Sequence, residues 1–175
     1  IYRNTKEFTE SKTLMSLYTA LVRPKIDYAC VIWFPYHATW ISQLERIQRK
    51  FLKYLCYKED GVYPQIGFPH SELLQRFSVT TTYNRNKMFS AMFIHKIVTN
   101  DIDCSDIIVK IPINANHRML SLRNQVIFAL PTPRTNVLKY SPLYRMCYIG
   151  NWVNRELGIF DKKKLEIKKL DYNES

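Results

Sequence analysis

Hydrophobic residues recur at helical spacing along much of this chain. After Ser11, a residue type that often caps helices, apolar positions repeat every three or four residues and predict a first helix over 11–22. Pro24 should end that helix, because proline disfavours the α conformation in the residue before it. The same spacing predicts a second helix over 24–33, which should end before Pro35.

The strongest amphipathic pattern covers residues 39–56. At about 100° per residue, the apolar side chains share one arc of roughly 160°. These residues are Ile41, Leu44, Ile47, Phe51, Leu52, Tyr54 and Leu55. Four cations, Arg46, Arg49, Lys50 and Lys53, lie on the other side of the predicted helix. The pattern therefore predicts a helix that packs on one face and presents positive charge on the other.

Gln48 breaks the apolar face of this predicted helix. A buried amide needs hydrogen-bond partners. We expect Gln48 to bond a neighbouring turn of the chain, with a ligand contact as the less favoured alternative.

The rest of the chain shows further helical patterns and one irregular stretch. The expected elements are a loop at 57–70, helices at 71–77, 82–99 and 103–109, a short strand at 125–130, and a helix from Ser141 through Trp152. The expected fold is mainly α. We expect a small helical bundle over 1–60 and a helical region with an irregular 110–141 segment over 61–160. A Lys-rich tail occupies 161–175.

Positive charge is the strongest feature of the composition. Lysine and arginine number 26 against 15 acidic residues, which gives a net charge of +11. Such a chain attracts polyanions. Only Glu45 and Glu59 lie near the predicted cationic face, which holds five cations when Lys58 is included. A solvated surface is the ordinary use of a charged face, but this imbalance favours phosphate binding. Arg118 and Arg123 could contact the same backbone.

No complete active site is visible in the sequence. The four cysteines and four histidines are scattered without zinc-ligand spacing, and the four glycines form no phosphate loop. We expect no catalytic residue, no metal site and no bound cofactor in this chain. Reduced thiols and the lack of a long apolar run indicate an intracellular protein, nuclear or cytoplasmic, with no membrane partner. Because the chain opens at Ile1, we expect a fragment.

Two sequence blocks resemble a known family. The first comprises Leu17-Tyr18, Leu21-Val22-Arg23-Pro24, Ile26-Asp27-Tyr28-Ala29, Trp33 and Pro35; the second runs from Leu44 to Phe51 as LERIQRKF. At this separation they resemble the region just past the polymerase core in reverse transcriptases of non-LTR retrotransposons, most closely the jockey type. Weaker similarities follow at Arg85, Arg118, Asn136, 141–145 and Asn151.

The resemblance implies a thumb and the segment beyond it in an RNA-directed DNA polymerase. The four cations would contact the backbone of a template–primer duplex or RNA–DNA hybrid, and the rest of the reverse transcriptase chain would be a partner. Tyr28, Trp33, Leu44 and Phe51 would form the thumb core. The aromatic-Ala-Asp-Asp turn that holds Mg²⁺ in that family is absent here, so Mg²⁺ is implied for a parent polymerase alone.

Two alternatives come from other functional classes. A vestigial or recruited copy could serve as a protein-interaction module with no nucleic-acid role. The Lys-rich tail could bind anionic membranes, although no aromatic anchor precedes Tyr172. Oligomeric state and nucleic-acid preference are open at this stage.

Overall fold

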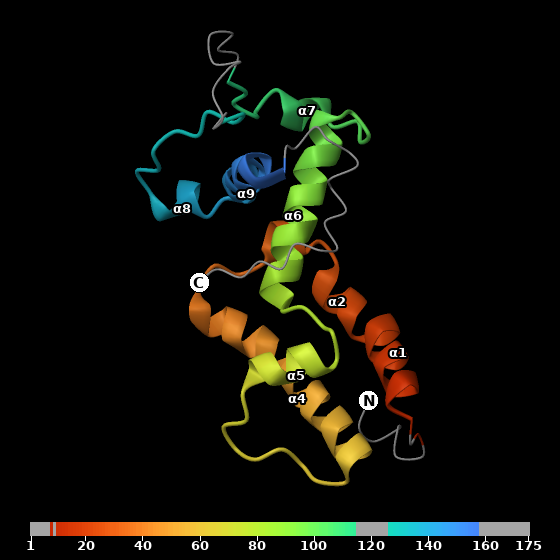
Figure 1. The fold of residues 1–175 in the computed structure, drawn as a ribbon. Coiled ribbons are helices and arrows are strands. Elements are labelled where there is room, and N and C mark those ends of the chain that lie inside the picture. Colours follow the sequence, from red (N-terminus) through yellow and green to blue (C-terminus); the bar gives the residue numbers. More distant parts are fainter. Residues whose placement is uncertain (1–7, 9, 115–125, 158–175) are drawn as a thin grey trace. The chain divides into compact units, whose positions relative to one another are not determined.

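The chain is mainly helical, as the sequence predicts. The computed structural model describes residues 8, 10–114 and 126–157, without the side chains of 156 and 157 (Figure 1). In chain order the helices are α1 (Ser11–Leu21), α2 (Arg23–Asp27), α3 (Cys30–Trp33), α4 (Ala38–Asp60), α5 (His70–Arg76), α6 (Thr82–Val98), α7 (Ser105–Ile108), α8 (Asn136–Lys139) and α9 (Pro142–Leu157).

The described residues divide into two compact units. The first runs up to Cys30 and from Phe34 to Arg85, and the second comprises Val31–Trp33 and the chain from Asn86 onward. The first unit therefore extends past residue 60, where we expected the helical bundle to end. The physical reason is that α5 packs on α4 and adds Leu73 to the same hydrophobic core.

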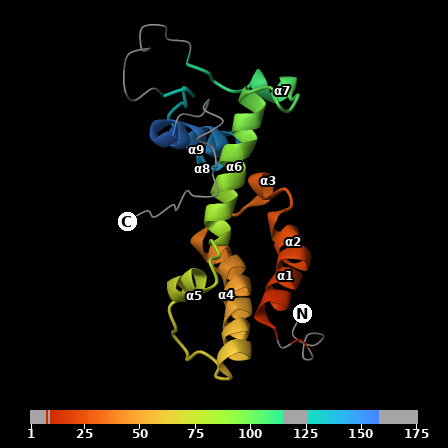
Figure 2. The ribbon, with the colours of Figure 1, turned by 45° about the vertical axis from the view of Figure 1, so that its right-hand side comes forward.

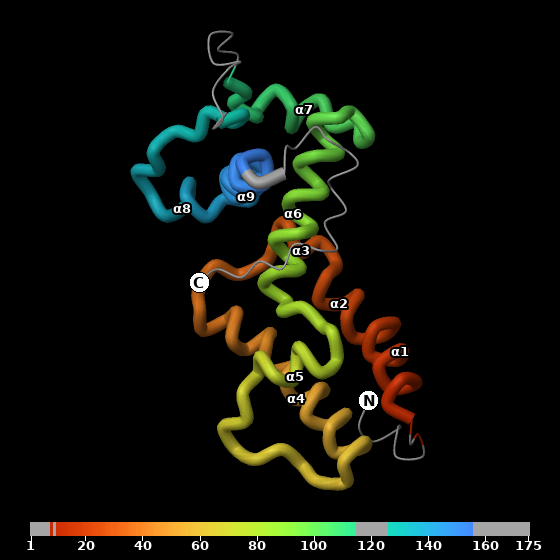
Figure 3. The backbone as a smooth tube through the Cα atoms, viewed as in Figure 1, coloured from red at the N-terminus to blue at the C-terminus, as the bar shows by residue number. Residues whose placement is uncertain are grey.

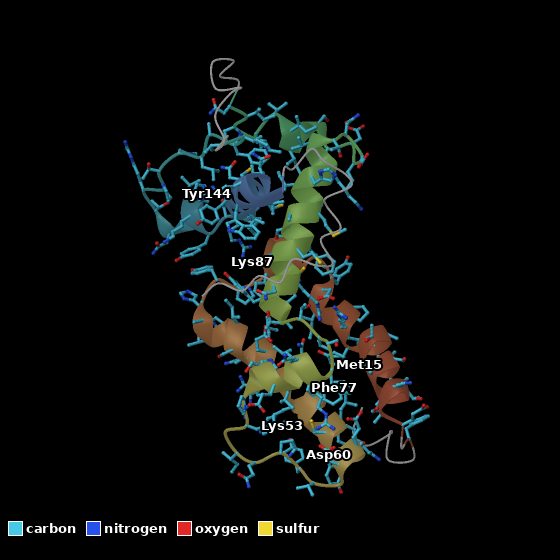
Figure 4. The ribbon with its side chains drawn as sticks, in the orientation of Figure 1. Met15, Lys53, Asp60, Phe77, Lys87 and Tyr144 are labelled. Atoms are coloured by element: carbon cyan, nitrogen blue, oxygen red, sulfur yellow. The ribbon has the colours of Figure 1, made fainter. Side chains whose placement is uncertain are left out.

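The core of the first unit joins α1, α4 and α5. Tyr18 stacks on Phe51, with ring centroids 4.2 Å apart and planes inclined by 8°. The buried core residues around this pair are Leu14, Leu52, Leu55, Cys56 and Leu73. Met15 and Phe77 pack against them from α1 and from the end of α5 (Figure 4). Figures 1 and 2 both show α5 beside α4. This core buries one face of α4.

The prediction of one helix over 24–33 is wrong. Ala29 adopts a left-handed conformation, with φ of 51°, and separates α2 from α3. A left-handed conformation is unfavourable for alanine, so an alanine at this position does not predict a break. The spacing of apolar residues does not predict one either. By contrast, α1 ends at Leu21 just before Pro24, as expected, and α4 continues to Asp60 before Gly61 ends it with φ of 73°.

A charged pair links α2 to the start of α6 within the first unit. The Nη2 of Arg85 donates a hydrogen bond to Oδ1 of Asp27. Arg85 is 2% exposed, and its Nε and Nη1 have no acceptor among the described residues. Asp27 is less enclosed and also lies 3.8 Å from Nε of Arg23. The buried guanidinium therefore depends on one carboxylate for its counter-charge.

The second unit packs around α6 and α9. Its larger buried cluster comprises Ile94, Ile97, Ile111, Phe128, Met146 and Cys147. The expected strand at 125–130 is present only as a single antiparallel bridge between Ile113 and Phe128. The side chain of Asn151 holds this bridge: its Oδ1 accepts from Phe128 N and its Nδ2 donates to Phe128 O, both at 2.9 Å.

The described part of the irregular 110–141 segment contains a short helix, α8, that the sequence pattern did not predict. In α8, Leu138 N donates to Oγ1 of Thr135 at 3.4 Å, so Thr135 caps the turn. The cap expected at Ser141 is confirmed, since Tyr144 N donates to Oγ of Ser141 at 3.4 Å ahead of α9. The Lys-rich tail and Arg118 and Arg123 lie outside the described residues.

The buried charge pair predicts unequal costs for its two partners. Asp27→Asn leaves the Arg85 guanidinium buried without counter-charge and should lower the free energy of unfolding by about 3 kcal/mol. Arg85→Met should cost less than half as much, because Asp27 keeps Arg23 and partial access to water. Urea unfolding followed by circular dichroism measures both. An equal or larger loss in Arg85→Met contradicts this account.

The two hydrogen bonds between Asn151 and Phe128 predict that Asn151→Asp lowers stability more at neutral pH than in acid. Asn151→Asp keeps the acceptor for Phe128 N, loses the donor to Phe128 O, and should lower the free energy of unfolding by about 1–3 kcal/mol at neutral pH. Part of the loss should return in acid, where a protonated carboxyl can donate. Thermal unfolding is the measurement, with Asn136→Asp at an exposed position as control. Equal stability of the two variants would refute the proposed role.

Candidate nucleic-acid interface

The rotation of α4 about its axis is set by a buried amide. Gln48 is fully buried, and its Nε2 donates to the backbone oxygen of Thr80 at 2.9 Å. This contact confirms the expectation that Gln48 bonds a neighbouring turn of the chain. The side chain lies among the buried residues of α4, so the opposite face of the helix is turned outward.

Glu45 also faces inward. Its Oε1 accepts hydrogen bonds from the Thr82 hydroxyl at 2.5 Å and from Tyr83 N at 3.0 Å, while Oε2 lies 3.5 Å from Nε2 of His70. Burial by itself would raise the pKa of this carboxyl, but His70, Thr82 and the Tyr83 amide together lower it below its ordinary value. The carboxylate of Glu45 therefore interacts with groups of the first unit and not with the outward-facing cations of α4.

The two acids at the end of α4 are engaged by Arg76 of α5. Its guanidinium bonds both carboxylate oxygens of Asp60 at 2.7 Å and Oε2 of Glu59 at 2.8 Å. The hydrogen bonds from Arg76 lower the pKa of Asp60. Every acid of α4 thus has a cationic or hydrogen-bonding partner other than the four predicted cations.

Three of the four predicted cations are exposed. Arg46, Arg49 and Lys50 form no ion pair with any residue that the structure describes, and all lie on the outward face of α4. Lys53 differs, because it is half-buried and its Nζ donates to the backbone oxygen of Gln65 at 3.1 Å. We use the term cationic face for Arg46, Arg49, Lys50 and Lys53 together (Figure 4 labels Lys53).

The cationic face has dimensions suited to a phosphate chain. The three exposed cations, from Arg46 to Lys50, span roughly 6 Å of the helix axis at 1.5 Å per residue, and their long side chains extend this reach. Successive phosphates of one B-form strand are about 3.4 Å apart along the axis, so the face can reach several of them. Because the acids of the helix are engaged elsewhere, an approaching phosphate meets positive charge that no α4 carboxylate cancels.

Sequence reasoning missed one residue on this face. Tyr57 follows Lys50 and Lys53 at helical spacing and is 45% exposed. Its position could have been found by extending the helical periodicity past Cys56. It was missed because the helix was expected to end there.

The expected thumb core is only partly present. Phe51 is buried as expected, and Leu44 is half-buried. The expectation is wrong for Tyr28 and Trp33, which are 80% and 44% exposed. Both placements came from the family resemblance, and the left-handed Ala29 lies between these two residues.

Comparison with known protein families, with curated proteins and with solved structures finds no match to this chain. Among the described residues, no three His, Cys, Asp or Glu side chains converge as metal ligands. The described helices include none with the length and hydrophobicity required to cross a bilayer.

The lowered pKa of Glu45 predicts a pH-dependent contribution to stability. A carboxyl whose pKa falls on folding stabilises the fold above its ordinary pKa of about 4.5, and that contribution is lost as the pH drops through the lower folded value. Glu45→Gln should therefore lower the free energy of unfolding by about 1–2 kcal/mol at neutral pH. The difference from the wild type should shrink below about pH 4.5. Urea unfolding across a pH series measures this.

The control for this experiment is Glu72→Gln, an exposed position in the first turn of α5. It should leave the pH profile close to that of the wild type. A Glu45→Gln deficit that persists unchanged in acid would mean that the carboxylate charge is not what stabilises this contact.

Proposed function

We propose that this chain binds the sugar–phosphate backbone of nucleic acid through the cationic face of α4. The observation that carries the proposal is the separation of charge on this helix. Its three acids are engaged by Arg76 or by the His70, Thr82 and Tyr83 groups, whereas Arg46, Arg49 and Lys50 point outward without an acidic partner among the described residues.

The net charge of +11 supports the same partner. Long-range attraction of that sign brings a polyanion to the protein, and the local cationic face then replaces counterions on the phosphates. Binding of this kind reads backbone position and charge, not base sequence. A template–primer duplex or an RNA–DNA hybrid is the class of ligand that this proposal names.

The resemblance to non-LTR retrotransposon reverse transcriptases gives the proposal its biological setting. In that setting the chain is the thumb and downstream region of an RNA-directed DNA polymerase, and the catalytic acids belong to a palm elsewhere in the parent protein. The residues of this chain would hold the nucleic acid without taking part in bond formation. The mainly helical first unit, with a cationic helix on its surface, is consistent with that role.

Charge reversal provides the test. Arg46→Glu, Arg49→Glu and Lys50→Glu combined should weaken binding to a labelled RNA–DNA hybrid at least tenfold at low salt. Because about three phosphate contacts are lost, the slope of log affinity against log salt should also flatten by about three. Fluorescence anisotropy across a salt series gives both quantities.

The matched control makes the same change in net charge at other exposed lysines. Lys12→Glu, Lys25→Glu and Lys96→Glu combined should reduce affinity by only a small factor and leave the salt slope nearly intact. Wild-type affinity that does not depend on salt, or equal effects of the two triple variants, would contradict the proposal. Capture of a protein partner that survives nuclease and high salt would instead favour the interaction-module alternative.

A further inference from the structure

The cationic face of α4 ends in a pair of exposed tyrosines. Tyr57 lies on the same side of the helix by its spacing from Lys50 and Lys53. Tyr63 belongs to the segment between α4 and α5, whose course Figure 3 shows. Their ring centroids are 6.4 Å apart with planes inclined by 51°. Both residues are about half exposed, at 45% and 53%, so neither belongs to the core.

The loop at 61–69 is held against α4 by Lys53, one of the four cations predicted to contact phosphate. Lys53 Nζ donates to Gln65 O at 3.1 Å and lies 6.0 Å from the centroid of the Tyr63 ring. The backbone hydrogen bond fixes the loop, and the ammonium attracts the face of the tyrosine ring. Pro64, directly after Tyr63, further restricts the backbone. The position of Tyr63 beside Tyr57 is therefore built into the fold.

Two half-exposed tyrosines at the end of the cationic face could bind both parts of an unpaired nucleotide, its phosphate and its base. Phosphates interact with the cations, and an unstacked base gains by lying on an aromatic face. A base inside an intact duplex already has its stacking partners and offers its face to nothing outside the helix. Exposed tyrosines can therefore favour single-stranded over fully paired nucleic acid, a difference to which phosphate-binding cations alone do not respond.

We propose that Tyr57 and Tyr63 form a stacking platform for unpaired bases, so that the preferred ligand of α4 is nucleic acid with a single-stranded segment. This inference rests on the proposed phosphate-binding function of the cationic face and narrows its substrate class. Lys53 is a positioning residue that holds the loop, and Arg46, Arg49 and Lys50 are the phosphate contacts. The single-stranded segment leaves the cations at the C-terminal end of α4.

The test compares three ligands with the same number of phosphates: a blunt duplex, a duplex with a single-stranded overhang, and the same overhang made of abasic nucleotides. The wild type should bind the natural overhang most tightly. Tyr57→Ala with Tyr63→Ala should weaken binding to it by about tenfold or more, because the unpaired bases lose the aromatic rings on which they stack. Affinity for the other two ligands should change less than about twofold.

Two further variants separate stacking from structural damage. Tyr57→Phe with Tyr63→Phe keeps both rings and should retain wild-type preference. Tyr28→Ala with Tyr148→Ala removes two exposed tyrosines outside the cationic face. This variant should also keep the wild-type preference for the natural overhang. Circular dichroism monitors helix content in every variant.

The possible failures are distinguishable. A wild type that binds none of the three ligands at low salt overturns the phosphate-binding function and this inference together. A wild type whose binding depends on Arg46, Arg49 and Lys50, but is unchanged by loss of both tyrosines, overturns the stacking platform alone. An equal loss on all three ligands would also overturn it, because that result indicates damage to the phosphate contacts.

Discussion

The rotation of α4 about its own axis is the constraint on which the candidate site depends. Gln48, fully buried, reaches Thr80 O, and Glu45 reaches the Thr82 hydroxyl and the Tyr83 amide. Two polar side chains, one turn apart, thus bond Thr80 just before α6 and the first two residues of α6. A helix held only by apolar contacts could adjust its rotation at modest cost, whereas directional hydrogen bonds in a buried setting strongly disfavour such a change.

This arrangement also separates the charges of α4. Its carboxylates are used for structure, Glu45 within the first unit and Glu59 and Asp60 in the contact with Arg76. Its guanidinium and ammonium groups at Arg46, Arg49 and Lys50 are left to solvent. A hydrated surface charge contributes little to the free energy of folding. The cationic face is therefore available for a polyanion.

Sequence reasoning correctly described the elements that depend on local patterns. The helices were expected because apolar residues repeat at their spacing, and the outward direction of the cations followed from the same wheel that placed Phe51 inside. Even the partner class of Gln48 could be inferred, since a buried amide has few options. Errors appeared where no local signal exists, as at Ala29, whose left-handed conformation divides an expected helix.

What the amino-acid sequence determined by itself is the helical content, the amphipathic character of α4 and the excess of positive charge. All three follow from residue type and spacing. Only the tertiary structure decided that Arg76 meets Asp60, that Arg85 meets Asp27, and that Lys53 holds the loop carrying Tyr63 beside Tyr57. These pairs join residues from different elements, and their meeting depends on how helices pack and where turns bend. Periodicity along one helix contains no information about either.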